Sequence, residues 1–561
     1  MPVAIHDPIS EEIPTNFEVE LVAESATDPE LLLHRYVSRD REILVKVPTS
    51  HSQLSGHRTH RAASEKVDAE NLEAYSEKES ASNRPASSEE DSAPTLVDFE
   101  EGDPEDPRNL PPYRKNLIAI TVILSLLNST FASSITSGIS GAIREEWGVA
   151  PIMTSLLVSL YMVGYVLGPL VYAPMSEHIG RRPILVTAFT FYFIFSVACP
   201  VAPNIGSLVA FRFLQGLFAT CPIAVSGGVF ADIYADPIKR GRAVALFCGS
   251  TIMGALCAPF ISGYIATSHM HWRFAFWVNT IFAGTVLIIL VFSIPETFRP
   301  VLLMKRARKM RKEGHNAVAA YELEDKDFKS FVTHVLLRPV IMLYKEPIVA
   351  AICLYIGMMY GLLYMFFLAF PIIFQQVRGL SPGKGGLMLL PIGLGAVCVT
   401  IAHYIYDIHV QKLRKQNKEV TLEQDRLFIT MFSGWFIPIG LFWLAWTSYP
   451  GVPNEVVMLG GIFFGVGFTS LFIGFLNYVT DCYKIYAASA HGIMSVTRSL
   501  IAASFPLFAP AMYNRMGIHW ATSLWAFVAL FLAPVTVLFY KYGHIIRARS
   551  AFASALAKQN L

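Results

Sequence analysis

The sequence predicts an all-α membrane protein with twelve transmembrane helices in two six-helix bundles, preceded by a disordered cytosolic tail. Three observations lead to this prediction. Of the 561 residues, 53% are hydrophobic and 16% charged, with a mean hydropathy of +0.44, a balance that a soluble globule does not keep. From residue 116 onward, apolar runs of about 20 residues recur, each long enough to cross the ~30 Å hydrocarbon layer. Basic residues gather in alternate connections between these runs.

Residues 1–110 are expected to form the acidic, disordered tail. The first 115 residues hold 25 acidic and 12 basic side chains. The segment 64–106 is rich in Ser, Glu and Pro, a composition that buries too little apolar surface to fold. Within the tail, residues 17–47 contain enough apolar residues for a local helix or strand, with a solvated linker as the alternative. The start of the chain lacks the charged-then-apolar pattern of a cleaved signal peptide.

The twelve apolar runs divide into two sets of six. They lie at 117–141, 152–173, 183–200, 207–231, 242–265, 274–294, 348–374, 385–407, 427–447, 456–479, 487–512 and 520–540. One long charged loop, 295–346, separates the first bundle (111–294) from the second (347–541), and residues 542–561 follow as a C-terminal tail. This six-plus-six symmetry indicates two related bundles.

The orientation follows from the basic residues, because Lys and Arg resist translocation. With a cytosolic N-terminus, the inner connections and the C-terminal tail hold 26 Lys and Arg residues, whereas the outer connections hold five. One missed or invented span would invert every later loop. We therefore expect both termini in the cytosol. The basic run 305–312 is expected to lie as an amphipathic helix on the inner leaflet, not to bind nucleic acid.

The connection between the second and third spans carries a charged motif from Gly168 to Pro183. A tight turn there is flanked by one carboxylate and two guanidinium groups that can pair across helix ends. The motif resembles the cytosolic loop signature of the major facilitator superfamily, Gly-x-x-x-Asp-Arg-x-Gly-Arg-Lys/Arg. The residues that match in role are Glu177, Gly180, Arg181 and Arg182. Ala173 and His178 depart from the pattern, and ordinary positive-inside residues are the alternative explanation for the two arginines.

Two further motifs lie inside spans. Arg212, Gln215 and Gly216 of the fourth span resemble the second signature of that superfamily, in which the arginine is linked to proton transfer; a structural clamp on neighbouring carbonyls is the alternative. The fifth span resembles the antiporter signature Gly-x-x-x-Gly-Pro-x-x-Gly-Gly. The residues it keeps are Gly254, Pro259 and Gly263, while Ala258 and Ser262 replace glycines. Small helix faces are also common in any membrane bundle.

Other stretches narrow the resemblance to the fungal twelve-span drug:proton antiporter branch, which includes multidrug, polyamine and metabolite exporters. Examples are Trp272-Arg-Phe-Ala-Phe-Trp277, Pro295-Glu-Thr-Phe-Arg-Pro300 and Ala231-Asp-Ile-Tyr234, whose Asp232 is grouped with the gating residues. The resemblance covers about residues 103–553. It implies a central cavity between the halves, opened to each side in turn, with coupling groups near the midplane.

The predicted cavity is poor in negative charge, because no Asp or Glu lies near the middle of any span. The candidate substrate-binding residues are Asn128, Gln215, Asn279, His403, Asn477, His491 and Arg498. The two histidines could carry the proton or merely link helices, and Arg498 could bind an anion or brace helices. A buried polycation would need carboxylates, so the pattern favours an anionic or neutral cargo, such as an organic acid.

These observations predict a monomeric secondary transporter that exports a small organic metabolite, exchanges it for protons and contacts membrane lipids. The plasma membrane is the expected site, with the vacuolar membrane as the alternative. A multidrug or polyamine antiporter and a non-transporting sensor stay open. No enzyme, cofactor or metal site is expected, because no His, Cys, Asp or Glu cluster gathers at one face and no phosphate-binding Gly-x-x-x-x-Gly-Lys-Ser/Thr is present. The seven cysteines are odd in number and read as packing residues.

Overall fold

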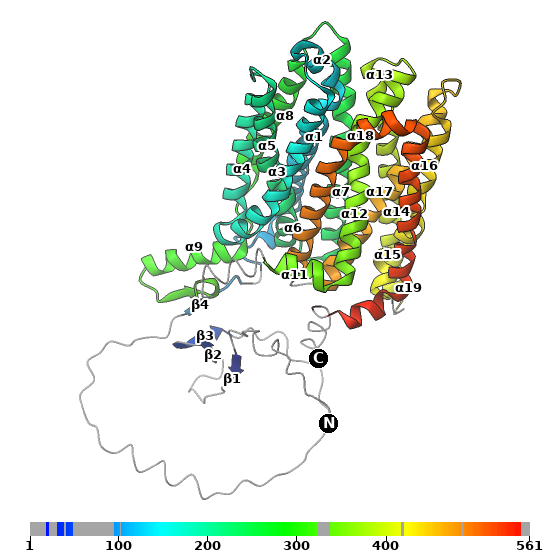
Figure 1. Ribbon diagram of the computed structural model, residues 1–561. Helices are drawn as coiled ribbons and strands as arrows, with labels where there is room; N and C mark the ends of the chain where they lie inside the picture. Colours follow the sequence, from blue (N-terminus) through cyan, green and yellow to red (C-terminus); the bar gives the residue numbers. More distant parts are fainter. Residues whose placement is uncertain are drawn as a thin grey trace, which may run out of the picture. The chain divides into compact units, whose positions relative to one another are not determined.

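The structure is a computed structural model that describes residues 18–21, 31–38, 41–48, 95–100, 102–323, 337–416, 420–483, 486–550 and 552 (Figure 1). The chain forms two compact units. The smaller unit takes residues 1–101 and 300–325, and the larger unit takes residues 102–299 and 326–561. The larger unit is the helical membrane body.

The smaller unit contains a five-stranded sheet in the order β1-β2-β3-β4-β5. The strands are β1 (Glu18–Leu21), β2 (Leu31–Ser38), β3 (Arg41–Pro48), β4 (Thr95–Val97) and β5 (Ala317–Ala319). β1, β2 and β3 pair antiparallel, with Leu31 opposite Pro48, and β4 pairs parallel with β5, with Thr95 opposite Ala317. The sheet thus joins the end of the tail to the central loop, a pairing that the sequence analysis did not foresee.

The prediction of a disordered tail falls largely outside the described residues. Within it, the segment 17–47, left open between a local helix or strand and a linker, contains β1, β2 and all of β3 except its last residue. The basic helix α9 (Arg299–Lys312) turns Leu303, Met304 and Ala307 onto Val97 of β4, so part of its apolar face is covered by its own unit. Near β5, Glu322 accepts two hydrogen bonds from Arg311 at 2.7 and 2.9 Å, and these bonds lower the pKa of its carboxyl group.

The first half of the membrane body contains eight described α-helices and the short 3-10 helix η2 (Pro107–Asn109). They are α1 (Pro112–Ser134), α2 (Thr136–Trp147), α3 (Pro151–Ile179), α4 (Arg181–Ala198), α5 (Ile205–Ala219), α6 (Cys221–Ile233), α7 (Pro237–Thr267) and α8 (Arg273–Ser293). α1 continues into α2, and α5 into α6, so each of these pairs makes one crossing. Six crossings result, as predicted from the apolar runs.

The second half begins with the short α11 (Arg338–Lys345) and ends with α19. Its further helices are α12 (Pro347–Phe370), η5 (Pro371–Val377), α13 (Pro382–Leu387), α14 (Leu390–Lys415), α15 (Leu422–Ser433), α16 (Phe436–Thr447), α17 (Asn454–Tyr483), α18 (Ala487–Leu532) and α19 (Pro534–Arg549). The 3-10 helix η3 (Ala320–Glu322) belongs to the smaller unit.

The described residues contain 11 helices that are long and apolar enough to span a membrane, and the last of them holds two crossings. This helix runs from Ser489 to Arg549 over 61 residues. At 1.5 Å per residue it would be about 90 Å long if straight, about three times the hydrocarbon thickness. Gly517, with φ 76° and ψ 164°, interrupts it where the sequence predicts the outer loop between spans 11 and 12. The twelve predicted crossings are therefore present.

The two halves meet along a seam of packed helices. α3 packs against α18, and α7 packs against α13, α14 and α17 of the other half. Figure 1 shows α2 and α13 at one end of the bundle and α6, α11, α15 and α19 at the other. We call these the α13 end and the Arg181 end, the latter after the residue that begins α4. The largest apolar core runs through both halves and across the seam.

Candidate functional site

Arg212 of α5 lies completely buried inside the first half, where four acceptors satisfy its guanidinium group. Its Nη1 donates to the carbonyl of Ala132 at 2.7 Å, its Nη2 to the carbonyl of Ser133 at 3.0 Å and its Nε to the carbonyl of Leu157 at 3.1 Å. α1 ends at Ser134, so two of these carbonyls belong to a helix end that lacks backbone donors. Arg212 therefore caps the break between α1 and α2.

The predicted polar residues Asn128, Gln215 and Asn279 gather around the same arginine. Gln215 accepts from Arg212 at 2.9 Å and donates to Ser196 Oγ at 2.8 Å. Asn128 donates to Asn279 Oδ1 at 3.4 Å, and Asn279 donates to the same Ser196 hydroxyl at 3.5 Å. The network thus links α1, α4, α5 and α8 within the first half. These side chains do not reach across the seam to Arg498.

Arg498 of α18 is the second buried arginine, and its surroundings differ sharply. The residue is 7% exposed, and its hydrogen bond is a long one, from Nη2 to Ser495 Oγ at 3.5 Å. Among the described residues, its Nε has no partner and no carboxylate lies within ion-pair distance. A buried guanidinium usually requires such partners. Arg498 is thus a buried cation that keeps unused hydrogen-bond donors.

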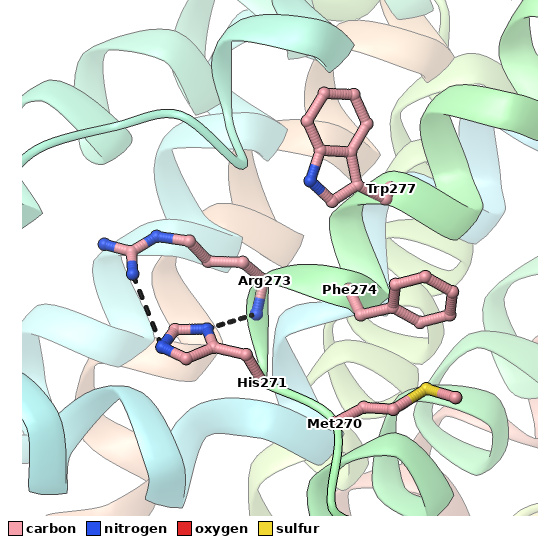
Figure 2. Close-up of a pocket in the computed structure, with 5 residues that line it drawn as sticks. All are labelled: Met270, His271, Arg273, Phe274 and Trp277. Carbon is pink, nitrogen blue, oxygen red and sulfur yellow. Dashed lines mark hydrogen bonds between the residues drawn. The ribbon is translucent and has the colours of Figure 1, made fainter.

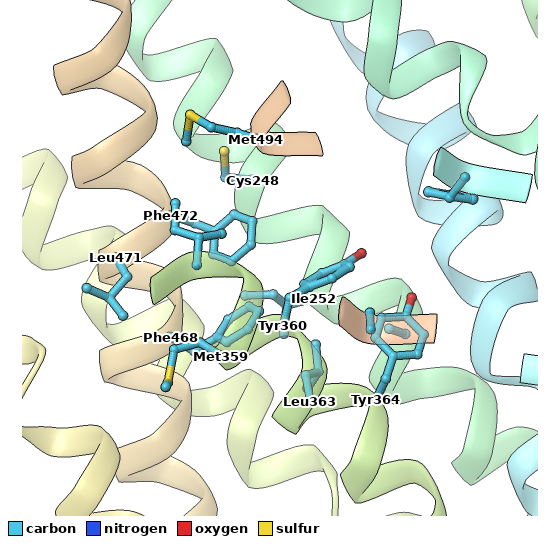
Figure 3. Packing of buried hydrophobic residues seen from close by; sticks show 14 of the residues in the cluster. Cys248, Ile252, Met359, Tyr360, Leu363, Tyr364, Phe468, Leu471, Phe472 and Met494 are labelled. Carbon is cyan, nitrogen blue, oxygen red and sulfur yellow. The ribbon is translucent and has the colours of Figure 1, made fainter. Parts of the chain in front are cut away.

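Aromatic rings surround Arg498 instead. Its guanidinium carbon lies 5.3 Å from the ring centroid of Tyr360 on α12 and 5.5 Å from that of Phe472 on α17. Figure 3 shows both rings packed with Phe468 and beside Cys248 of α7, which comes from the first half. Tyr364, one turn along from Tyr360, shares a hydrogen bond of 2.8 Å with Ser133 across the seam. This part of the seam is occupied by aromatic side chains.

The two predicted histidines each share a hydrogen bond with a hydroxyl inside the second half. His491 Nε2 lies 2.8 Å from Thr480 Oγ1, and one helix face carries it close to Arg498, seven residues further along α18. His403 Nε2 lies 2.9 Å from Ser470 Oγ, between α14 and α17. Asn477 is half-buried on α17 and makes no hydrogen bond with the residues described. The predicted substrate residues therefore divide into a connected network in the first half and separate positions in the second half, where His491 and Arg498 share α18.

The motif between α3 and α4 forms a cluster of charges within the first half. Arg181 donates to Asp232 at 3.2 Å and lies 4.0 Å from Glu177. Glu296 accepts from the backbone amides of Arg181 and Arg182 at 2.9 and 3.3 Å, so it caps the start of α4. Gly180 has φ 111°, and a Cβ there would collide with the Glu296 carboxylate. These contacts connect the ends of α3, α4 and α6 to the segment after α8.

A similar ion pair lies in the second half, and another joins the halves. Arg426 at the start of α15 donates to Asp481 of α17 at 2.7 Å, as Arg181 does to Asp232. Arg242 of α7 lies 3.9 Å from Asp407 of α14, and its guanidinium carbon lies 4.8 Å above the ring of Tyr404. Both contacts of Arg242 cross the seam at the Arg181 end.

The antiporter-like motif of α7 lies where three helices approach closely. A Cβ on Gly254 would clash with Leu127 and Thr130 of α1, and one on Gly263 would lie 2.5 Å from the Pro382 carbonyl of α13. The space between α2, α7, η5 and α13 is only about 10 Å³, so it is too small for a cargo molecule. Pro259 lines this space. The motif therefore allows α7 to contact both α1 and the other half.

The carboxylates described in the membrane body lie at the ends of the predicted apolar runs or in the connections between them. Three of them, Asp106, Glu346 and Glu423, are buried, and none was named as a site residue from the sequence. Glu346, fully buried before α12, accepts from Tyr483 at 2.8 Å, and Glu423, 3% exposed at the start of α15, pairs with Arg547 at 3.2 Å. A cavity of about 440 Å³ opens at the surface between α7 and α8, lined by Arg273 and four neighbouring residues (Figure 2). Arg273 pairs with Glu146 at 3.1 Å. The cavity contains none of the predicted site residues.

Sequence reasoning missed the residues that act through tertiary contacts. Glu296 stood in the quoted Pro295-Glu-Thr-Phe stretch, yet its capping role needs the fold. Arg242 and Asp407 were recognised only as charges near helix ends, although their spacing from the apolar runs placed both at one membrane face. Tyr360 and Phe472 gave no signal, because aromatic residues fill many positions of these apolar runs.

Comparison with known proteins fits this architecture. Residues 121–506 match the model of the Major Facilitator Superfamily. The MFS-type transporter traF of Penicillium crustosum is 37% identical over 455 residues, covering 81% of this chain and 92% of that protein. The citrinin biosynthesis cluster MFS transporter mrr1 of Monascus ruber is 38% identical, covering 82% and 92%, and the efflux pump FUBT of Fusarium oxysporum is 36% identical, covering 83% and 78%.

Among solved structures, the xylose transporter XylE of E. coli in a partially occluded inward-open conformation has the same fold. The TM-score is 0.57 at 18% identity, and the match covers 77% of this chain and 98% of that chain. At this identity the likeness concerns the fold alone. Together with the family match and the fungal relatives, it leads to one conclusion: the chain belongs to the major facilitator superfamily of membrane transporters.

Proposed function

We propose that this protein exports a small organic metabolite, anionic or neutral, by alternating access in exchange for protons. The observation that carries the proposal is Arg498, a buried cation at the seam with unused donors and no carboxylate nearby among the described residues. An anion that enters when the halves separate would supply the missing acceptors. Relatives named as an efflux pump and as a biosynthesis-cluster transporter support export of a metabolite.

A polycationic cargo is disfavoured by the same surroundings. The buried carboxylates Glu346 and Glu423 lie at helix ends and already accept from Tyr483 and Arg547. A second cation beside Arg498 would meet repulsion in a region of low dielectric. Broad drug or polyamine antiport is therefore the less favoured alternative.

The proton step is assigned to groups at or near this site. His491 lies about two helical turns before Arg498 on α18, and His403 lies on α14, each with a hydroxyl partner. Loss of a proton from His491 to the cytosol as the anion arrives, and uptake of a proton from outside as the anion leaves, would couple the two movements as an exchange. The carbonyl contacts of Arg212 support a clamp in the first half more than a proton relay. We further propose that the protein acts as a monomer in the plasma membrane with both termini in the cytosol.

Transport by membrane vesicles that contain the full chain tests the cargo. Arg498→Ala should reduce export of an acidic metabolite by about tenfold to a hundredfold, the cost of losing a hydrogen-bonded charge, and should leave a neutral analogue unchanged. Arg498→Lys, which keeps the charge without the planar fork, should retain part of the activity. Undiminished export of the acid by Arg498→Ala would refute the proposal.

An imposed pH gradient tests the exchange. Export should accelerate when the outside is acidic and slow when an uncoupler collapses the gradient. His491→Gln should lose this response, whereas His403→Gln serves as the comparison within the same half. Rates that ignore both the gradient and the uncoupler would exclude proton exchange while leaving export of an anion intact.

A further inference from the structure

The side chains that surround Arg498 are aromatic, although aliphatic side chains would exclude water equally well. Tyr360 is 2% exposed and Phe472 5% exposed. Their ring centroids are 5.8 Å apart, and the planes are inclined at 45°. Phe468 continues the wall, 4.8 Å from Phe472 in a stacked arrangement. The two rings next to the guanidinium thus form a wedge, and the positive charge lies within 5.5 Å of both ring centroids.

The wedge stabilises the cation without neutralising it. Ring faces carry partial negative charge and hold a guanidinium at 5.3 to 5.5 Å. They leave the hydrogen-bonding edge of the guanidinium unsaturated, as the unpartnered Nε shows. Arg212 has only one such ring, Tyr161 at 4.4 Å, and its edge is filled by carbonyls. Of these two arginines, and among the residues described, Arg498 is therefore the one that combines a free binding edge with flat walls.

We infer that the Arg498 site selects anions in which the charged group is attached directly to a planar aromatic ring. When such an anion contacts the guanidinium edge, its ring lies between Tyr360 and Phe472 and replaces part of their contact with each other. Ring-to-ring contacts add about 0.5–1.5 kcal/mol beyond buried area, which corresponds to a preference of about twofold to tenfold over a saturated ring of the same charge. This inference rests on the proposed function and adds the class of anion.

The position at the seam makes the selection relevant to transport. Tyr360, Phe472 and Arg498 come from three helices of the second half, while Cys248 of the first half lies in the same cluster (Figure 3). Separation of the halves would uncover the wedge from the side of α7. The anion is thus recognised by one half and enclosed by the other.

Equilibrium binding to the purified full-length protein in lipid nanodiscs tests the inference. Radiolabelled benzenesulfonate and cyclohexanesulfonate are suitable probes, because both stay anionic at all working pH values and differ only in the ring. We expect benzenesulfonate to bind about twofold to tenfold more tightly. In Tyr360→Leu and Phe472→Leu the ratio should fall to about one, while Tyr360→Phe, which keeps the ring, should retain it. Size-exclusion profiles identify any variant that does not fold. Tyr360→Leu and Phe472→Leu are two separate tests, so the inference can still be checked if one of them fails to fold.

The outcomes separate this inference from the proposed function. If both sulfonates bind equally to the unaltered protein and Arg498→Gln abolishes both, anion recognition stands and ring selection is overturned. Equal loss of both probes in the two Leu variants, with an unchanged ratio, also overturns it, because the rings then only brace the arginine. If neither sulfonate binds, or Arg498→Gln binds both as well as the unaltered protein, the proposed function itself fails at this site.

Discussion

Removing the ion pair between Arg242 and Asp407 should loosen the seam at the Arg181 end. Asp407→Asn deletes the charge with little change of shape, and Arg242→Gln deletes both the charge and the contact with Tyr404. Because α7 and α14 belong to different halves, each variant should raise the population in which this end is open. Arg242→Gln removes two contacts and Asp407→Asn only one, so Arg242→Gln should raise this open population more.

The expected magnitudes are small and distinguishable. The Arg242 Nε to Asp407 Oδ2 distance is 3.9 Å, too long for a hydrogen bond, and the side chains are 37% and 28% exposed. Such a pair contributes about 0.2–1 kcal/mol, and the contact with Tyr404 adds about 0.5–1 kcal/mol. Asp407→Asn should therefore shift the closed-to-open ratio by at most about fivefold. Arg242→Gln should shift it by about threefold to thirtyfold.

Electron spin distance measurements can check these ratios. Labels at Ile179 and Lys412, both exposed at the Arg181 end, report the separation of α3 and α14. Cys257 and Cys398, the cysteines that are not buried, are first replaced by Ser. Arg414→Gln provides a matched control, because it breaks an ion pair of 2.7 Å with Asp425 inside one half. An unchanged distribution in Arg242→Gln, or an equal change in Arg414→Gln, would refute the reasoning.

Three further predictions concern single contacts. Arg212→Gln should lower the free energy of unfolding by roughly 3 kcal/mol or more, because it leaves buried carbonyls without a hydrogen-bond donor. Arg498→Gln should lower it by less than about 1 kcal/mol, and unfolding by SDS titration compares the two variants. Gly386→Ala would put a Cβ 2.5 Å from the Pro259 carbonyl and should open the α13 end, which labels across α7 and α13 would detect. Pairing with Arg311 lowers the pKa of Glu322. The pair therefore stabilises β5 fully above the usual carboxyl pKa of about 4.3, and this stabilisation is lost as the pH falls through the lowered value. Hydrogen-exchange protection of residues 317–319 should fall in acid, and Glu322→Gln should remove that pH dependence.

The fold followed from the sequence because the bilayer imposes a strong, simple constraint. A helix must be apolar for about 20 residues to cross it, and the alternation of basic loops checks the count. The apolar runs therefore matched the crossings, including the last two, where one continuous helix is divided at Gly517. The five-stranded sheet was missed for the opposite reason. β4 and β5 are only three residues long and lie far apart in the chain, so no local pattern predicts their pairing.

The candidate site was predictable in its residue types and not in its grouping. Arg212 and Arg498 were both recognised as buried charges, but nothing in the sequence distinguishes their surroundings. Only the fold shows that a helix break supplies carbonyls to Arg212, whereas Arg498 faces rings. Polar residues such as Asn128 and Asn279 likewise look suited to a cavity until their partners are known. Hydrogen-bond satisfaction is a tertiary property that periodicity does not carry.

The two ends of the seam are closed by different forces, and this difference bears on the order of opening. At the α13 end, Gly263 and Gly386 allow α7 and α13 to touch through their backbones, because a Cβ at either position would lie only 2.5 Å from a carbonyl oxygen of the other helix. Separating such surfaces loses dispersion contacts that water does not replace. At the Arg181 end, Arg242 and Asp407 are partly exposed, so both charges regain water when they part. We therefore expect the Arg181 end to open first from this closed arrangement. Added salt should favour this opening, because the Debye length falls from about 10 Å at 0.1 M to 3 Å at 1 M. Across that range of salt concentration, the distance between the same two spin labels should increase, while the distance between a pair across the α13 end should not.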